Sequence, residues 1–137
     1  MKKVYFSCSI RGGRQDLALY QELICGLCDK AEVLTEFVGE AALEEQEAGS
    51  MTDRDIYERD VALERQADII VAECSTPSLG VGYELAFAEA LGKPVYILFR
   101  EGEGRRLSAM VAGNPRFTVF HYHTAAEALQ KLEAALQ

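Results

Sequence analysis

The sequence lacks long apolar runs, an excess of basic residues and the common nucleotide-loop signatures. No apolar run approaches the roughly 18 residues needed to cross a bilayer. The first residues, Met-Lys-Lys, are followed at once by a strand-like segment and not by the apolar core of a signal peptide. We therefore expect a cytoplasmic protein.

Basic residues are too few for a protein that binds polyanions. Fourteen Lys and Arg stand against 22 Asp and Glu, which gives a net charge of −8. This charge disfavours binding to nucleic acid polymers or to anionic membranes. A small anion can still bind, because a local nest of backbone N–H groups and one Arg outweighs the distant, screened field of the net negative charge.

Neither a Walker loop, GxxxxGK[ST], nor a GxGxxG fingerprint occurs, so ATP and dinucleotide sites are disfavoured. The spacing of Cys25 and Cys28 is CxxC, but it falls inside a helical pattern and lacks a second pair. Cys8 and Cys74 each follow a predicted strand, with no His nearby in sequence. We expect neither a metal nor an organic cofactor.

What is present fits one globular domain over residues 1–137, with 49% hydrophobic and 26% charged residues. Five short apolar segments alternate with helical patterns. We expect an α/β fold, Rossmann-like or flavodoxin-like, with a five-stranded parallel sheet of order 2-1-3-4-5 and helices on both faces. The predicted strands are Lys3–Ser7, Val33–Phe37, Ile69–Ala72, Val95–Phe99 and Phe117–Phe120.

The helical patterns run from Asp16 to about Lys30, from Thr52 to Ala67, from Tyr83 to Leu91 and from Thr124 to the end. Thr52 with Asp55, and Thr124 with Glu127, have capping-box spacing. The acidic segment Gly39–Ser50 is compatible with a short helix or a mobile flap.

In this strand order the chain reverses direction between strands 1 and 3, which creates a crevice at their carboxyl ends. The two Gly/Ser-rich turns, Cys8–Arg14 and Cys74–Gly82, face that crevice. A phosphate fits there, because Gly turns and helix N-termini present free N–H groups and Arg supplies a charged fork. The candidate groups are Ser9, Arg11, Ser78 and the backbone around Gly12 and Leu79–Gly80. In the alternative interpretation, these groups bind no phosphate: Ser9 and Ser78 are turn or capping hydroxyls, and Arg11 is a solvated charge.

Two acids, Glu84 and Asp60, are expected near the same crevice. Asp60 stands on an otherwise apolar helical stripe, where a charge is costly to bury. Paired carboxyls are used to cleave glycosidic bonds. In the alternative interpretation, Glu84 only complements the helix dipole, and Asp60 pairs with Arg59, Arg65 or solvent.

Three motifs resemble one enzyme family. Ser9–Arg14 reads SIRGGR, Pro77–Glu84 reads PSLGVGYE and Leu107–Met110 reads LSAM. In this order they resemble the 2'-deoxynucleoside 5'-phosphate N-hydrolases of the nucleoside 2-deoxyribosyltransferase superfamily. The resemblance implies a Rossmann-like homodimer that cleaves deoxynucleoside monophosphates into a free base and 2-deoxyribose 5-phosphate.

The resemblance also implies roles for single residues. Glu84 would be the nucleophile, Asp60 would assist departure of the base, and Tyr5 would position Glu84 and crowd the C2 side of the sugar. Phosphate would be held by Ser9, Arg11, Ser78 and the partner subunit's Ser108. The substrate-binding set is completed by Ile10, Gly12, Gly80 and Met110. The sequence departs from the family pattern at Cys8, usually Gly, and at Phe37, often His in relatives.

The same residues are compatible with three other functions. A deoxyribosyltransferase would share the covalent step but pass the sugar to a second base. A non-catalytic sensor would bind a nucleotide monophosphate and signal through a dimer or through Gly39–Ser50. A ribonucleotide-preferring N-glycosidase would need more room at the 2' position.

Overall fold

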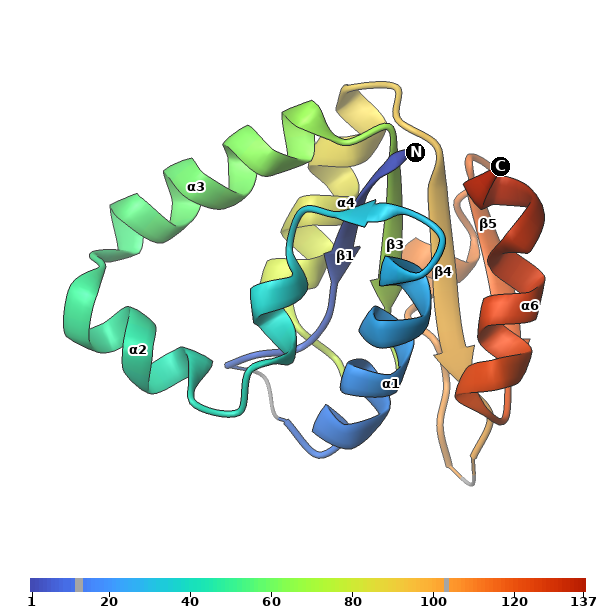
Figure 1. The fold of residues 1–137 in the computed structure, drawn as a ribbon. Helices are drawn as coiled ribbons and strands as arrows, with labels where there is room; N and C mark the ends of the chain where they lie inside the picture. Colours follow the sequence, from blue (N-terminus) through green and yellow to red (C-terminus); the bar gives the residue numbers. More distant parts are fainter. Residues whose placement is uncertain (12–13, 103) are drawn as a thin grey trace.

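The structure is a computed structural model that describes residues 1–11, 14–102 and 104–137 (Figure 1). Gly12 of the predicted substrate-binding set lies outside the described residues. Five parallel strands form a sheet of order β2-β1-β3-β4-β5, which confirms the predicted fold class and strand order. The strands are β1 (Lys3–Ser7), β2 (Glu32–Val33), β3 (Ile69–Glu73), β4 (Val95–Arg100) and β5 (Phe117–Tyr122).

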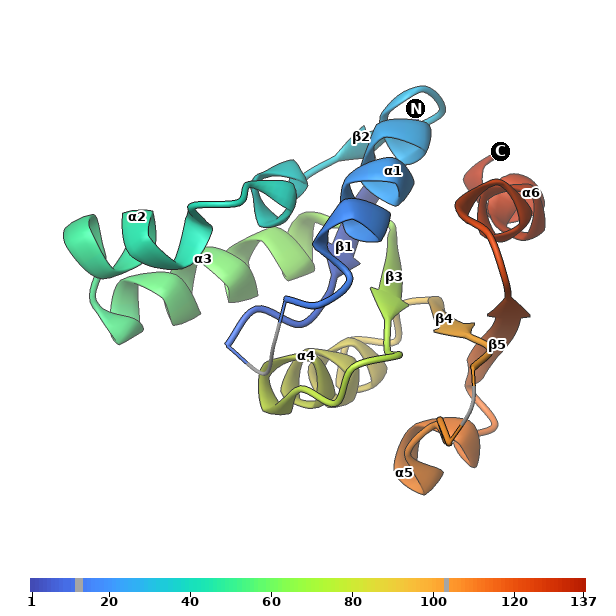
Figure 2. The same cartoon turned by 90° about the horizontal axis from the view of Figure 1, so that it is seen from below.

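Helices cover both faces of the sheet, as predicted (Figure 2). On one face lie α1 (Leu17–Cys28) and α6 (Ala125–Leu136). These two helices pack closely because Gly26 has no side chain; a Cβ there would come within 2.2 Å of Leu129 Cδ1. On the other face lie α3 (Asp53–Gln66), α4 (Leu79–Ala90) and α5 (Ala109–Ala112). The short helices η1 (Glu36–Gly39) and α2 (Leu43–Ser50) connect β2 to α3.

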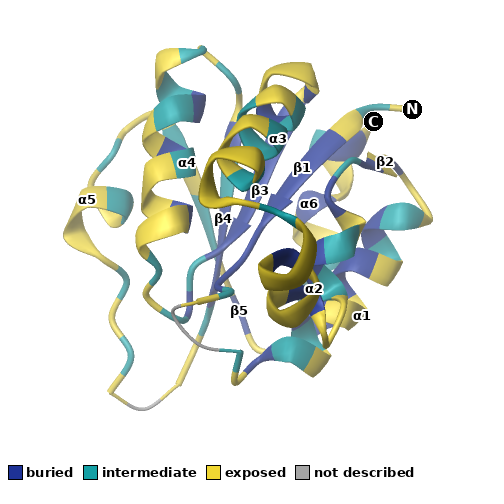
Figure 3. Ribbon diagram, turned by 90° about the vertical axis from the view of Figure 1, so that its left-hand side faces the viewer, coloured by how far each residue is buried: buried dark blue, intermediate teal, exposed yellow. Residues whose placement is uncertain are grey.

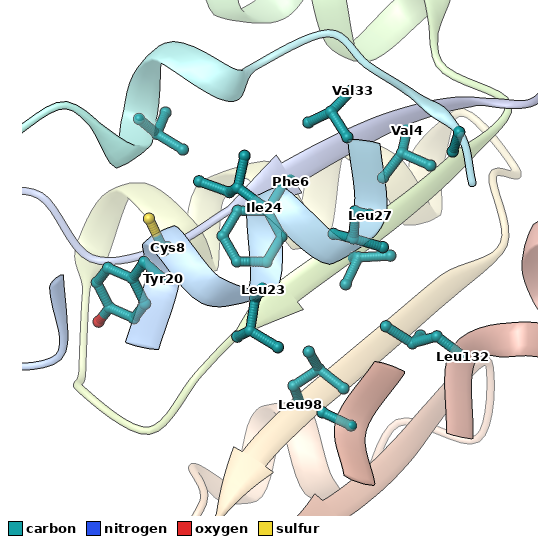
Figure 4. Packing of buried hydrophobic residues seen from close by; sticks show 14 of the residues in the cluster. Val4, Phe6, Cys8, Tyr20, Leu23, Ile24, Leu27, Val33, Leu98 and Leu132 are labelled. Atoms are coloured by element: carbon teal, nitrogen blue, oxygen red, sulfur yellow. The ribbon is translucent and has the colours of Figure 1, made fainter. Parts of the chain in front are cut away.

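Two apolar cores hold the central strands. The core beneath α1 and α6 includes the fully buried Phe6, Leu27 and Leu98 (Figure 4). The core beneath α3 and α4 includes Ile70 and Leu85. Every residue of β3 is buried, and the exposed surface lies on the outer sides of the helices (Figure 3). The ends of β1 and β3 are therefore fixed from both sides.

The start of α3 follows the predicted capping box. Thr52 Oγ1 accepts a hydrogen bond from the Asp55 N–H at 3.1 Å, and Asp55 Oδ2 accepts one from the Thr52 N–H at 2.9 Å. Each bond satisfies an N–H that the helix leaves unpaired. The cap fixes where α3 begins, and so which side of the helix Asp60 occupies.

The second strand was predicted too long. The strand expected over Val33–Phe37 ends at Val33, and the chain enters η1 at Glu36. The buried Thr35 hydroxyl accepts from the Phe6 N–H at 2.9 Å and donates to the Phe6 carbonyl at 2.7 Å. Because this side chain replaces two ladder bonds of β1, the backbone is free to leave the sheet.

Two helix starts also differ from the prediction. Asp16 precedes α1 but makes no capping bond, and its carboxylate instead accepts from Arg100 Nη2 at 2.5 Å. Helix α4 begins at Leu79, earlier than the predicted Tyr83, because Ser78 caps it through the Val81 N–H at 3.3 Å. Glu84 therefore lies in the second turn, where the helix dipole acts less strongly than in the first.

Gly39–Ser50, for which a short helix or a flap was expected, ends in helix α2. Its outer side is exposed, while Leu43 and Glu47 are buried. No helix among the described residues combines the length and the apolar character needed to span a bilayer.

Candidate active site

A cavity of about 500 Å³ lies between the turn after β1, helix α3 and the start of α4. We call it the Glu84 cavity. Its walls bring together six of the predicted site residues, namely Ile10, Arg11, Asp60, Ser78, Gly80 and Glu84. Cys8, Glu47, Asp53, Ile56, Tyr57, Leu79 and Val81 complete the lining.

The two oxygens of Glu84 are both anchored. Tyr5, on β1 and only 2% exposed, donates its hydroxyl to Glu84 Oε2, and Ser7 Oγ donates to Oε1 at 3.3 Å. Burial raises the pKa of Glu84 to about 7, the Tyr5 and Ser7 bonds oppose this rise, and the charge of Asp60 adds to it. Near neutral pH, Glu84 thus exchanges between a carboxylate and a carboxylic acid.

Tyr5 remains a proton donor in this pair. Burial, together with the charges of Glu84 and Asp60, raises the pKa of Tyr5 far above its usual range. The phenol therefore keeps its proton at working pH and holds one oxygen of Glu84 in place.

Asp60 lines the same cavity from α3. Its side chain is 27% exposed, and Arg59 Nε donates to Asp60 Oδ1 at 2.9 Å. Burial raises the pKa of Asp60, and Arg59 counteracts part of that rise. The pairing with Arg59 considered from the sequence is present, and it does not remove Asp60 from the cavity wall.

The turn after β1 contains Ser9 and Arg11, two of the predicted phosphate-binding residues. Ser9 is completely buried, and its Oγ has no hydrogen-bond partner among the described residues. Arg11 Nη2 pairs with Asp53 Oδ1 at 3.1 Å, with side chains 62% and 87% exposed. Exposed pairs of this kind contribute roughly 0–1 kcal/mol. A bound anion can therefore replace Asp53 as the partner of Arg11 at small cost.

The N-terminus of α4 also lines the Glu84 cavity. Ser78 caps the helix, while Leu79 and Gly80 occupy its first turn, where backbone N–H groups lack intrahelical partners. A Cβ at Gly80 would meet only Ser78 Oγ, at 3.9 Å. Packing inside the protein therefore does not require glycine there, and its absent side chain leaves room in the cavity.

Ser108 and Met110 are not brought to Glu84 within one protomer. They line a second cavity of about 590 Å³ between α4 and α5, which shares Ser78, Leu79 and Val81 with the first. Met110 is 84% exposed and Leu79 is 96% exposed.

Three charged residues near the Glu84 cavity had not been predicted as part of the site. Glu47 of α2 and Arg59 of α3 form a pair at 2.5 Å. Glu64 is 1% exposed, and burial with the charges of Glu84 and Asp60 raises its pKa to about 8. Glu64 is four residues after Asp60, and this helical spacing was a usable signal. No local spacing in the sequence predicts the contact between Glu47 of α2 and Arg59.

Within the described ranges, no three His, Cys, Asp or Glu side chains gather in a way that would hold a metal ion. The Glu84 cavity is lined by carboxyl groups. Glu84 is held by a tyrosine and a serine, Asp60 lies in the same cavity, and Arg11 and the N-terminus of α4 line it as well. This set of groups suits displacement of a leaving group from a sugar carbon, in a sugar that carries a phosphate at its other end.

The chain is similar to several known proteins. Residues 4–131 match the nucleoside 2-deoxyribosyltransferase family. A 5-hydroxymethyl-dUMP N-hydrolase of Mus musculus is 54% identical over 125 residues, covering 87% of this chain and 71% of the relative. A Trichoplax adhaerens protein with the provisional name 2'-deoxynucleoside 5'-phosphate N-hydrolase 1 is 46% identical, covering 89% of this chain and 85% of the relative.

Among solved structures, a CMP N-glycosidase of Clostridium botulinum superposes with a TM-score of 0.70 over 98% of this chain and 99% of its own. At 22% identity, this likeness shows a shared fold. The family match and the close relatives confirm the resemblance read from the three sequence motifs. This chain belongs to the nucleoside 2-deoxyribosyltransferase family.

Proposed function

We propose that this protein hydrolyses the N-glycosidic bond of 2'-deoxynucleoside 5'-monophosphates, releasing a free base and 2-deoxyribose 5-phosphate. The observation that carries the proposal is the Glu84 carboxyl, held by Tyr5 and Ser7 in a cavity that also contains Asp60. The relatives named as N-hydrolases of deoxynucleotides support the same reaction.

In the proposed mechanism, a Glu84 oxygen attacks C1' of the sugar. A C–O bond forms as the bond between C1' and the base nitrogen breaks, and the electron pair leaves with the base. Asp60 gives the base a proton. Water then attacks C1' and passes a proton to Asp60, the ester bond breaks, and Glu84 is regenerated. In this scheme Tyr5 fixes the attacking carboxylate and limits the space beside C2', which favours deoxyribose.

Phosphate binding supplies orientation in this proposal. Arg11, Ser78, Leu79 and Gly80 line the Glu84 cavity, and the N–H groups of Leu79 and Gly80 lie in the first turn of α4. Ser9 lies in the turn after β1, buried behind the cavity wall, with its hydroxyl unpaired among the described residues. Energy from a remote phosphate can be used to align C1' with Glu84, so its loss lowers turnover as well as affinity. We expect a nucleoside without phosphate to be a poor substrate.

We further propose that the active form is a homodimer in which the partner subunit's Ser108 joins the phosphate site. The support is the exposed apolar surface around the second cavity, where Leu79 and Met110 protrude. Exposed apolar patches of this kind mark contact sites. A second copy packed over this surface would carry the LSAM segment toward a neighbouring Glu84 cavity.

The deciding experiment is to incubate the protein with the common deoxy and ribo monophosphates and with 5-hydroxymethyl-dUMP, and to separate the released bases by chromatography. We expect release from deoxynucleotides, and a loss of roughly 10³-fold or more in Glu84→Gln, which keeps the shape without the nucleophile. Equal cleavage of a deoxynucleoside and its monophosphate would contradict the phosphate site. Full activity in Glu84→Gln would contradict the mechanism.

Addition of a free acceptor base separates hydrolysis from transfer. A new nucleotide would identify a deoxyribosyltransferase, whereas we expect only free base and sugar phosphate. Binding of monophosphates without any base release would instead identify a sensor.

A further inference from the structure

Arg59 makes four contacts at the edge of the Glu84 cavity. Its Nε donates to Asp60 Oδ1 at 2.9 Å, and its Nη2 donates to Glu47 Oε2 at 2.5 Å. Its Nη1 lies 3.4 Å from Met51 Sδ, and the guanidinium carbon lies 4.2 Å from the centre of the Phe37 ring. We call these five residues the Arg59 cluster.

The Arg59 cluster differs from the ordinary surface pairs of this protein. The side chains of Arg59, Glu47 and Asp60 are 24%, 7% and 27% exposed. In contrast, Arg54 and Glu58 on the same helix are 85% and 56% exposed, although their distance is 2.8 Å. Partly buried charges are screened less and have fewer alternative partners in water.

The guanidinium is held in one plane and one direction. Its edges are bound to Asp60 and Glu47, and its face lies on the Phe37 ring. A planar guanidinium that is bound along both edges fixes the direction of the hydrogen bonds to its partners, which a single ammonium does not do. A short aspartate side chain bound to such a fork has few rotamers left.

We propose that Arg59 is a positioning residue, which aims the Asp60 carboxyl at the base end of the cavity and fastens α2 to α3 through Glu47. This inference deepens the proposed function and rests on it, since Asp60 is the proposed proton donor. A donor contributes only when it lies within hydrogen-bond reach of the leaving group.

Glu47 gives the cluster a second property. An Arg beside Asp60 alone would strongly favour the ionised carboxylate, which cannot donate a proton. Burial raises the pKa of Asp60, Arg59 lowers it, and the charge of Glu47, which is bound to the same guanidinium, raises it again, so Asp60 keeps part of its affinity for a proton. The charged and titratable groups around Asp60 are Glu47 on α2, Arg59 and Glu64 on α3, Glu84 on α4 and Tyr5 on β1.

The first test measures Asp60 directly by ¹³C NMR titration of its carboxyl, assigned by its absence in Asp60→Asn. We expect Arg59→Gln to raise the pKa of Asp60 by about one unit, because an attractive charge is removed. Glu47→Gln should lower the same pKa, because a repulsive charge is removed. The matched control Arg54→Gln on the exposed side of α3 should leave it unchanged. Two shifts of the same sign, or none, would overturn the proposal.

The second test measures turnover of the deoxynucleotide that the wild-type protein cleaves best. We expect Arg59→Gln to lower kcat roughly 10- to 100-fold, part of what a proton donor supplies, with little change in KM. Arg59→Lys should recover only part of this loss, because an ammonium cannot bind both carboxylates through a planar fork. Wild-type kcat in Arg59→Gln would overturn the positioning role.

The two tests fail in different ways. If the wild-type protein cleaves no nucleotide, the proposed function fails, while the NMR titrations still decide whether Arg59 and Glu47 control Asp60. If Arg59→Gln does not fold by circular dichroism, Glu47→Gln decides the question, and an unchanged pKa of Asp60 in that variant overturns the proposal.

Discussion

At the scale of single residues, Glu84 connects the fold to the pH dependence of the proposed reaction. Attack on C1' requires the carboxylate, and the pKa of Glu84 is about 7. We expect kcat/KM to rise with pH through about 7. Tyr5→Phe removes a hydrogen bond that lowers this pKa, so the rise should move to higher pH and the rate should fall. Rate profiles from pH 5 to 9 measure both effects, and a shift to lower pH would contradict the role of Tyr5.

The burial of Glu64 leads to a separate prediction about stability. Its pKa is about 8 in the folded protein, against 4.5 as the ordinary value. Between these values the folded state holds a proton that the unfolded state has lost, so the free energy of unfolding falls as pH rises. Glu64→Gln removes this dependence and should be more stable than wild type at pH 8 by about 1 to 3 kcal/mol, but not below pH 4.5.

Urea denaturation at several pH values tests this expectation. Glu58→Gln is a suitable control, because Glu58 lies on the exposed side of the same helix with its side chain 56% exposed. An equal gain in both variants would show that the burial of Glu64 is not the cause.

Local patterns identified part of the site in advance, and the missing part is long-range. Glu84, Asp60 and Ser78 were predicted because each follows from a motif or a helical stripe, and they do line one cavity. Arg59 was considered only as a partner of Asp60, and its bond to Glu47 was missed, because that contact joins two helices whose packing depends on the tertiary fold.

At the scale of elements, the N-caps of α3 and α6 share one kind of threonine bond, although only α3 has the full capping box predicted for both, because Glu127 accepts from the His123 N–H and not from Thr124. Thr52 Oγ1 accepts from the Asp55 N–H at 3.1 Å, and Thr124 Oγ1 accepts from the Glu127 N–H at 3.2 Å. Thr52→Ala and Thr124→Ala should each cost about 1 kcal/mol of unfolding free energy. Only Thr52→Ala should also lower kcat/KM, because α3 carries cavity residues while α6 lies on the opposite face of the sheet.

Denaturant unfolding and steady-state kinetics of the two variants provide the comparison. Equal losses of activity would mean that stability alone, and not the placement of α3, limits the reaction.

The elements that were predicted well are those fixed by local chemistry. The strands of the two cores follow from short apolar runs, and the start of α3 follows from its capping box. The prediction was wrong where a side chain decides the backbone path. Thr35 takes over the bonds of β1 and ends β2 early, and Asp16 pairs with Arg100 on a distant strand and does not cap α1.

At the scale of the whole molecule, the proposed dimer can be tested by mixing two defective variants. If a site combines Glu84 with the partner subunit's Ser108, then Glu84→Gln and Ser108→Ala subunits restore one complete site in each mixed dimer. Random exchange of equal amounts should return about a quarter of the wild-type activity. Sedimentation velocity gives the oligomeric state. A fully active monomer, or no recovery on mixing, would contradict the shared site.

The early end of β2 also bears on self-association. Sheet edges invite strands from other molecules, because their N–H and C=O groups are unpaired. Here the first edge strand contains only Glu32 and Val33, and the next part of β1 is already bonded by the Thr35 hydroxyl. An incoming strand would find almost no ladder to extend on this side. Thr35, whose bonds to Phe6 end β2 early, thus also leaves this edge of the sheet with little free backbone for a strand of another molecule.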